Sequence, residues 1–324
     1  MGDTVRQKVR DSTSAMVSQD VRSIRSRVFL IAKVVGSVVL LFFLFRKLRL
    51  PDLLFAVRQA DKPFLGLAVF ASFLFLLLRA YKWFRIVRPY LAPPNFYRVL
   101  TSYMFGLGIS IFTPGRIGEV ARVANIGITE KSGPTALFLL DKFIDVLVVF
   151  SMALYGMYRL LPSGWYASAL SVLLVAAFVG LFCMSWIYQI LKGAITSVPL
   201  GEKLGRICES VAMLDRRKIG VNIALTLSSY IICVFEVYFI LNAFCNATLS
   251  TVLAVHPIVM TTNVLPITFG GLGLREGASV LLYGNLGIAK EHAFWGGFLI
   301  FVFNTLLHGI LGTILINVRL RRTT

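Results

Sequence analysis

The chain has 324 residues, of which 57% are hydrophobic and 15% are charged, and its mean hydropathy is +0.79. An ordinary soluble domain carries about 25% charged residues. The composition therefore excludes an ordinary soluble domain and indicates that lipid surrounds most of the chain. The net charge of +18 would suggest a nucleic-acid partner for a soluble protein. Here Lys and Arg lie mostly between apolar runs, where they set topology and meet anionic phospholipid headgroups. We therefore expect no nucleic-acid partner.

Cysteine and histidine do not form a recognisable site in the sequence. The four cysteines and three histidines are scattered, and no CxxC pair occurs: Cys183, Cys208, Cys233, Cys245, His256, His292 and His308. This spacing favours neither a zinc site nor a disulfide framework. We expect no metal and no cofactor.

The apolar runs predict an all-α integral membrane protein with about six full spans. A polar, basic cytoplasmic tail (1–27) precedes a single membrane domain (28–318), and a short basic tail (319–324) follows it. A helix needs about 20 apolar residues to cross the hydrocarbon core. The ranges that meet this requirement are 28–45, 63–79, 134–158, 166–188, 219–241 and 293–317. The basic segment 189–218 reads as a linker that includes an amphipathic helix on the inner leaflet.

Two further apolar stretches, 99–130 and 251–288, contain many glycines and prolines. Such residues break helices, and broken backbone at membrane depth occurs only inside protein or beside a watery cavity. We predict a re-entrant or spanning broken hairpin in each stretch.

The positive-inside rule places both termini in the cytoplasm. With that orientation the inside segments carry 19 Lys and Arg, against 6 outside. The two hairpins then enter from opposite faces, so the unit of span, hairpin and span occurs twice in inverted orientation (about 63–158 and about 219–317). Inverted repeats are typical of transporters.

The first hairpin contains Arg116, Glu119 and Arg122, spaced by three. On a helix that begins near Gly115, after Pro114, these side chains share one face, and Glu119 lies between the two arginines. Arg116 or Arg122 would bind an anionic headgroup, since guanidinium matches phosphate geometry. The alternative is a self-satisfied Arg–Glu–Arg ladder that only holds the hairpin together.

Charged residues also interrupt the third predicted span, at Asp141, Lys142 and Asp145. The two carboxylates share a helix face, whereas Lys142 points about 100° away. Each charge near the bilayer centre costs about 2.5–3.5 kcal/mol on insertion scales. The carboxylates are therefore expected to face inward as partners of Arg116, Arg122 or a cation. Alternatively, all three lie near the cytoplasmic interface, where Lys142 can reach the headgroups.

In the second hairpin, Arg275 and Glu276 follow Gly271 and Gly273. Glycines have no side chain that would cover the backbone N–H groups, and an anion-binding nest requires such accessible N–H groups. Because Arg275 and Glu276 are adjacent, we expect each to pair elsewhere, including across to the first hairpin.

Three motifs in this order resemble the lysylphosphatidylglycerol synthase transmembrane-domain family: SIFTPGRIGEVARV (110–123), LDKFIDVLVV (140–149) and LPITFGGLGLREGASVLL (265–282). The resemblance runs from about the first to the last span and implies a lipid flippase or related lipid-handling protein of the plasma (inner) membrane. The positions that match the motifs are Pro114, Gly115, Gly118, Glu119, Asp141, Asp145, Gly271, Gly273, Arg275 and Glu276. Fused members carry a soluble aminoacyl transferase domain, which does not follow the last span here, so we expect a stand-alone member that does not make lysyl-lipid.

The leading hypothesis is a non-enzymatic transporter that moves an amphiphilic lipid with an anionic or sugar headgroup between leaflets. Arg116, Arg122 and Arg275 would attract the headgroup, while Glu119, Asp141, Asp145 and Glu276 would hold these cations. One alternative is an intramembrane lipid-headgroup transferase that uses Asp141 and Asp145. Another is a non-transporting protein that delivers lipid to a lipid- or glycan-modifying enzyme, which would also be a partner.

Overall fold

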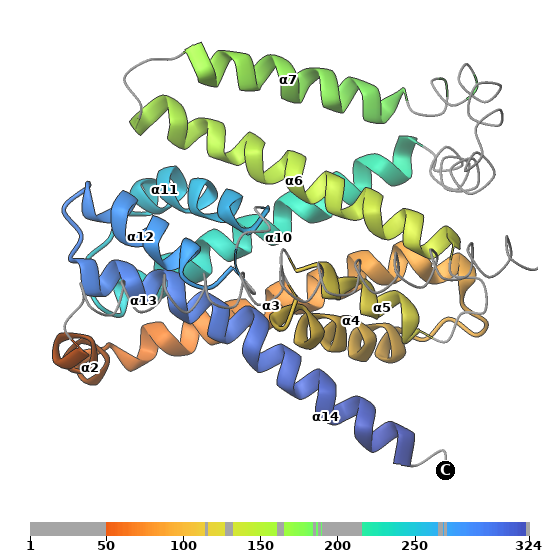
Figure 1. The fold of residues 1–324 in the computed structure, drawn as a ribbon, viewed down its shortest axis with the longest axis horizontal. Coiled ribbons are helices and arrows are strands. Elements are labelled where there is room, and N and C mark those ends of the chain that lie inside the picture. Colours follow the sequence, from red (N-terminus) through yellow and green to blue (C-terminus); the bar gives the residue numbers. More distant parts are fainter. Residues whose placement is uncertain are drawn as a thin grey trace, which may run out of the picture.

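The structure is a computed structural model that describes residues 50–113, 116–126, 132–160, 165–183, 216–264 and 271–321, and the single positions 186, 189 and 268. All regular elements in these ranges are helical (Figure 1). Several predictions lie outside the described residues: the tail 1–27, the span 28–45, most of the segment 189–218, and Pro114 and Gly115.

Four stretches of the described chain are long and apolar enough to cross a membrane. They are α3 (Lys62–Val87) with the 3-10 turn η1 (Arg88–Tyr90), α7 (Trp165–Phe182), α10 (Arg216–Asn242), and the continuous rod of α13 (Lys290–Phe301), the π-helix η4 (Val302–Leu307) and α14 (His308–Arg321). The 27 residues of α10 span about 40 Å at the usual rise, which exceeds the hydrocarbon core. These helices lie where spans are predicted at 63–79, 166–188, 219–241 and 293–317, and α14 continues into the predicted tail 319–324.

The helix α6 (Ser132–Leu160) covers the predicted span 134–158. With 29 residues α6 is long enough to cross a membrane, but its apolar sequence is interrupted by three charged residues: Asp141, Lys142 and Asp145. A short helix, α2 (Leu50–Gln59), precedes α3.

Both glycine-rich stretches contain broken helices, as predicted, and we refer to each as a hairpin. The first consists of α4 (Phe96–Ile111), the 3-10 turn η2 (Ile117–Val120) and α5 (Ala121–Ala124). The second consists of α11 (Leu249–Thr261), the 3-10 turn η3 (Thr262–Val264) and α12 (Leu274–Gly284). Asn95 and Thr248 cap the first helix of each by accepting a hydrogen bond from a backbone N–H, which satisfies a donor that an uncapped helix leaves free. The second arms differ in length, since α5 has 4 residues and α12 has 11.

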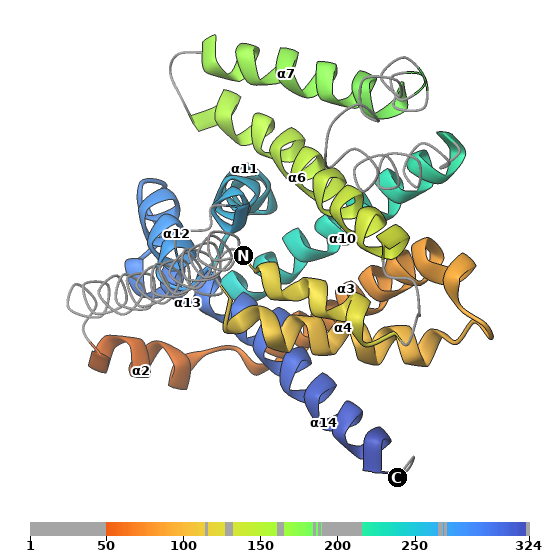
Figure 2. The same cartoon turned by 45° about the vertical axis from the view of Figure 1, so that its right-hand side comes forward.

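Each hairpin packs on a long helix from the other half of the chain. The helix α4 lies along α14, and α11 lies along α6, while α3 and α10 cross in the centre. Figures 1 and 2 show the pair α11 and α12 on the opposite side of the molecule from α4 and α5, with α7 at the edge beside α6. The two halves are therefore interleaved.

Glycines permit these close crossings. A Cβ on Gly309 of α14 would lie 2.7 Å from the Cα of Gly108 on α4, and real Cβ atoms do not approach so closely. A Cβ on Gly156 of α6 would overlap the carbonyl of Ala254 on α11. Small residues serve this purpose in membrane helices because they let backbones touch.

Candidate functional site

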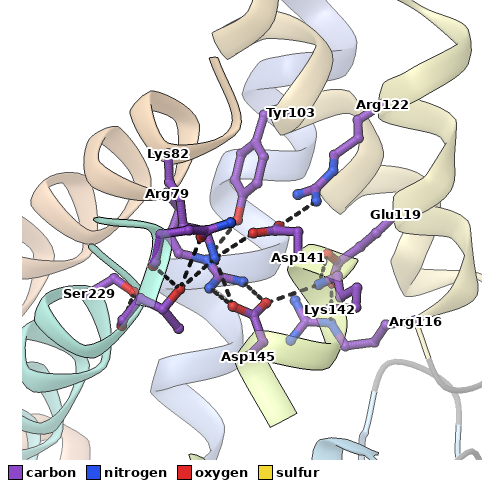
Figure 3. Close-up of polar contacts among 12 residues, drawn as sticks. Arg79, Lys82, Tyr103, Arg116, Glu119, Arg122, Asp141, Lys142, Asp145 and Ser229 are labelled. Carbon is purple, nitrogen blue, oxygen red and sulfur yellow. Dashed lines mark hydrogen bonds and ion pairs between the residues drawn. The ribbon is translucent and has the colours of Figure 1, made fainter. Parts of the chain in front are cut away.

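The long helices α3 and α6 place opposite charges on facing surfaces. Arg79 and Lys82 are three residues apart on α3, and Asp141 and Asp145 are four apart on α6, so each pair lies on one face of its helix. All four side chains are buried. Figure 3 shows them pointing toward one another.

Asp145 is held by three cations. Both terminal nitrogens of Arg79 donate to its two oxygens at 2.5 Å, Lys82 Nζ donates at 2.8 Å, and Lys142 Nζ lies 3.8 Å away. Arg79 Nε also donates to the Tyr103 hydroxyl of α4 at 3.4 Å. A bidentate guanidinium–carboxylate pair has a strongly preferred geometry. The Arg79–Asp145 pair therefore fixes α3 against α6.

Lys82 joins the two carboxylates of α6. Its amine lies 2.7 Å from Asp141 Oδ1 and 2.8 Å from Asp145 Oδ1, and it donates to the Thr226 hydroxyl of α10 at 2.9 Å. Lys82 therefore has two hydrogen-bond acceptors and a further ion-pair partner on two helices, which offsets the cost of burying the ammonium group.

Arg122 of α5 is buried beside Asp141. Its guanidinium donates to Asp141 Oδ2 at 2.9 Å and lies 4.2 Å from the ring centre of Trp83 and 4.6 Å from that of Phe138. Cation–π contact stabilises a desolvated arginine. Arg122 thus pairs with Asp141, as one of the sequence hypotheses proposed, and does not belong to an Arg–Glu–Arg ladder.

Glu119 lies between two cations, but its second partner differs from the prediction. It pairs with Arg116, whose Nε lies 3.2 Å from Oε1, and with Lys142 of α6. The predicted single helix face is wrong because Arg116 has a left-handed backbone, with φ of 57°, and Glu119 follows in a 3-10 turn. This change of register turns Arg122 away from Glu119 and toward Asp141.

The turn at Glu119 requires a glycine beside it. A Cβ on Gly118 would lie 2.6 Å from the Thr113 hydroxyl and 2.7 Å from the Ile109 carbonyl oxygen. The Gly118 N–H donates to the Thr113 hydroxyl at 2.7 Å. The close approach of η2 to α4 therefore places Glu119.

These contacts form one connected set of charges, which we call the ionic network: Arg79, Lys82, Arg116, Glu119, Arg122, Asp141, Lys142 and Asp145. It contains five cations and three carboxylates, so its formal charge is +2 when all are ionised. Removing charges from water is expensive unless they are paired, and each of these has an opposite partner. The excess of positive charge favours an anion beside the network.

In the second hairpin, Arg275 and Glu276 pair with each other, and the expectation that each pairs elsewhere is wrong. Arg275 Nη2 donates to Glu276 Oε1 at 2.5 Å. Glu276 also folds back to the start of α12, where its Oε2 accepts a hydrogen bond from the Gly273 N–H at 2.6 Å. Gly273 and Gly271 have φ of 85° and 79°, a conformation that favours glycine. Arg275 Nε also donates to the Gly297 carbonyl of α13 at 2.8 Å.

A cavity of about 420 Å³ lies between the two hairpins. Among the seven charged residues predicted for the site, four line it: Arg116, Glu119, Asp145 and Arg275. The other three are not in its lining as the described residues define it. Arg122 and Asp141 pair with each other behind the wall, and Glu276 lies behind Arg275. The cavity thus joins charged residues from both halves of the chain.

Sequence reasoning missed Arg79 and Lys82, which lie at the centre of the ionic network. Arg79 ends the predicted span 63–79, and Lys82 counted only toward the positive charge of a cytoplasmic segment. The signal was available, since two carboxylates inside a span need buried cations, and these two cations share a face on the preceding span. Further cavity residues without a sequence signal are Tyr103, Asn263, Asn304 and Thr305.

A protein-family model matches most of the chain. The model of the family described as the lysylphosphatidylglycerol synthase TM region matches residues 30–312. No curated protein matches the sequence significantly.

Proposed function

Because the chain belongs to the lysylphosphatidylglycerol synthase transmembrane-region family, we propose that it moves an amphiphilic lipid between the leaflets of a membrane. The headgroup, anionic or sugar, enters the cavity between the hairpins while the acyl chains stay in the bilayer. The family match makes a membrane lipid the natural substrate class.

The observation that carries this proposal is the position of the cavity beside a network with a formal charge of +2. Arg116 and Arg275 line the cavity from opposite hairpins. The side chain of Arg116 is 23% exposed, so its guanidinium is accessible from the cavity. An anionic headgroup there would neutralise part of the excess charge and would find a planar donor group suited to phosphate.

The packing of the hairpins supports an inverted repeat. The helices α3, α4, α5 and α6 form one unit, and α10, α11, α12 and α13–α14 form the other. Each first hairpin arm packs on the last long helix of the opposite unit, α4 on α14 and α11 on α6, which is the relation that a two-fold exchange of the units produces. The proposal has about six spans and two re-entrant hairpins, with both termini cytoplasmic in a plasma membrane. Transporters of this design bind substrate where the repeats meet.

In this proposal the seven charged residues singled out from the sequence have different roles. Arg116, Glu119, Asp145 and Arg275 are accessible from the cavity and contact the headgroup in this proposal. Arg122, Asp141 and Glu276 hold these groups in place from behind. Transport is ion-coupled or downhill.

The arrangement favours transport over headgroup transfer. A carboxylate nucleophile or base needs a free lone pair aimed at the substrate, whereas Asp141 contacts two cations and Asp145 contacts three. We therefore propose a protein that is not an enzyme, with lipid and anionic phospholipid headgroups as partners.

The test is reconstitution in liposomes that carry fluorescent phosphatidylglycerol, with a fluorescent neutral glycolipid as a second arm. We expect transbilayer exchange at least tenfold faster than in protein-free liposomes. Arg116→Gln and Arg275→Gln should each remove most of this acceleration. Arg58→Gln, a loss of one exposed charge on α2, is the matched control and should exchange normally.

Mass spectrometry of the same liposomes separates the alternatives. Exchange with unchanged lipids supports transport. A new headgroup product would instead identify a transferase. Saturable lipid binding with neither exchange nor product would identify a delivery protein, for example one that serves a lipid- or glycan-modifying enzyme.

A further inference from the structure

A second polar site lies outside the ionic network, on α10. Glu236 is fully buried. Its Oε2 accepts a hydrogen bond from Asn304 Nδ2 at 2.7 Å, and its Oε1 has no hydrogen-bond partner within the described chain. No ion pair involves Glu236 among the described residues, in contrast with the carboxylates of the ionic network. A buried carboxylate without a counter-charge is very costly, so such a group binds a proton instead.

Asn304 connects Glu236 to the cavity. It lies in the π-helix η4 and lines the cavity, and its Oδ1 has no partner in the described structure. π-Helical turns in α-helices often occur at functional sites because they realign side chains. Through Asn304, Glu236 lies one side chain away from the cavity.

Thr305, the next residue of the π-helix η4, contacts Arg116 of the proposed headgroup site. Thr305 accepts a hydrogen bond from Arg116 Nη2 at 3.2 Å. Neighbouring residues of one π-helical turn therefore contact a cavity cation and a buried carboxyl group. A headgroup that draws Arg116 away from Thr305 would change the turn that also carries Asn304.

Titratable and charged groups near this region come from α10 itself and from α3, α6, α11, α12, α14 and the turn at Arg116. Cys233 on α10 itself lies 3.9 Å from His256 of α11, and His308 of α14 contacts Ser72 of α3 at 3.5 Å. Four charged or ionisable groups act electrostatically on Cys233: Glu236, Arg79, Arg275 and Arg116. On α6, Asp145 is engaged by Arg79. The experiment must therefore separate Glu236 from the two histidines and the cysteine.

We propose that Glu236 is a proton-binding site coupled to the headgroup site through Asn304 and Thr305, so that the lipid moves together with a proton. The coupling rests on the proposed function. On deprotonation the O–H bond of the Glu236 carboxyl group breaks, the electron pair stays on the carboxylate, and the proton passes to solvent in the cavity. An anionic headgroup makes the site more negative and favours the protonated form, so lipid and proton bind cooperatively.

The first test measures lipid binding against pH, with fluorescent phosphatidylglycerol in phosphatidylcholine nanodiscs. Binding to the wild type should tighten as pH falls, by up to about tenfold per pH unit, the limit for one linked proton. Glu236→Gln keeps an oxygen for Asn304 and mimics the protonated form. It should bind as tightly as the acidic wild type and lose the pH dependence. A variant that keeps the wild-type slope, or a wild type with no slope between pH 5.5 and 9, overturns the proposal.

Glu291→Gln is the matched control, since it makes the same change at the start of α13 away from the cavity lining. It should keep the wild-type slope. A pH gradient across liposomes should bias the leaflet distribution of the lipid in the wild type and in Glu291→Gln. In Glu236→Gln, exchange should continue without this bias.

Infrared spectroscopy of the wild type reports carboxyl protonation directly. This measurement does not depend on whether a variant folds. We expect a carboxylic C=O band that weakens as pH rises and strengthens when phosphatidylglycerol is added. Absence of this band at acidic pH overturns the proposal. If the wild type does not exchange lipid, the transport function fails, whereas the infrared band and the binding slope still decide the role of Glu236.

Discussion

Arg79 of α3 and Asp145 of α6 form a two-pronged ion pair, with both N···O distances at 2.5 Å. Asp145→Asn would leave Arg79 and Lys82 buried without their shared carboxylate. Removing one partner of a buried pair costs about 3–5 kcal/mol, so we expect a loss of this size in the free energy of unfolding, measured by denaturant titration in mixed micelles. Glu291→Gln should stay within about 0.5 kcal/mol of the wild type. A change that small at Asp145 would contradict the assigned pairing.

Arg122 and Arg116 should respond differently to lysine. Arg122→Lys keeps the charge but loses the planar contact with Trp83 and Phe138, and lysine does not reproduce a stacked guanidinium. We expect a loss of about 1–2 kcal/mol in unfolding free energy, the size of a desolvated cation–π contact. Arg116→Lys, at a partly exposed side chain, should change stability by less than about 0.5 kcal/mol. Equal effects at both positions would argue against the buried role of Arg122.

The crossing of α4 and α14 has no room for a side chain at Gly309. Gly309→Ala places a Cβ against the Gly108 backbone, so the helices must separate, at a cost of about 1–3 kcal/mol. Gly180→Ala on α7 is the control, because a Cβ there meets nothing within 4 Å. Thermal unfolding in detergent should show a lower Tm for the first variant and an unchanged or higher Tm for the second. The reverse order would refute the close crossing.

Gly273 has φ of 85° at the start of α12, where its N–H also donates a hydrogen bond to the Glu276 carboxylate. Gly273→Ala should destabilise the protein by about 1–2 kcal/mol, since an L residue is strained in this conformation. Gly277→Ala, inside the same helix with open space around its Cβ position, should be neutral or stabilising. Denaturant titration of both variants makes the comparison. A neutral Gly273→Ala would contradict the backbone assigned here.

The helical character and the two broken hairpins could be predicted from the sequence because they depend on local composition. Glycines and prolines within apolar stretches mark the breaks, and the family motifs include Glu119, Asp145 and Arg275, which line the cavity. The partners could not be predicted in the same way. The pairing of Arg122 with Asp141 depends on the left-handed turn at Arg116, which is not a typical conformation for arginine. Arg79 and Lys82 resembled ordinary cytoplasmic charges. Glu236 is the single acidic residue of α10, and its role depends on Asn304, 68 residues away.

The interleaved packing has a consequence for how the protein is made. The helix α4 emerges from the ribosome early, but the surface that it needs belongs to α14, near the end of the chain. Until α14 is inserted, the glycine face of α4 has no permanent neighbour. The packing of the first hairpin, which carries Arg116 and Glu119 of the cavity, is thus completed last. A chain interrupted before α13 would leave these two charged residues in an incomplete cavity.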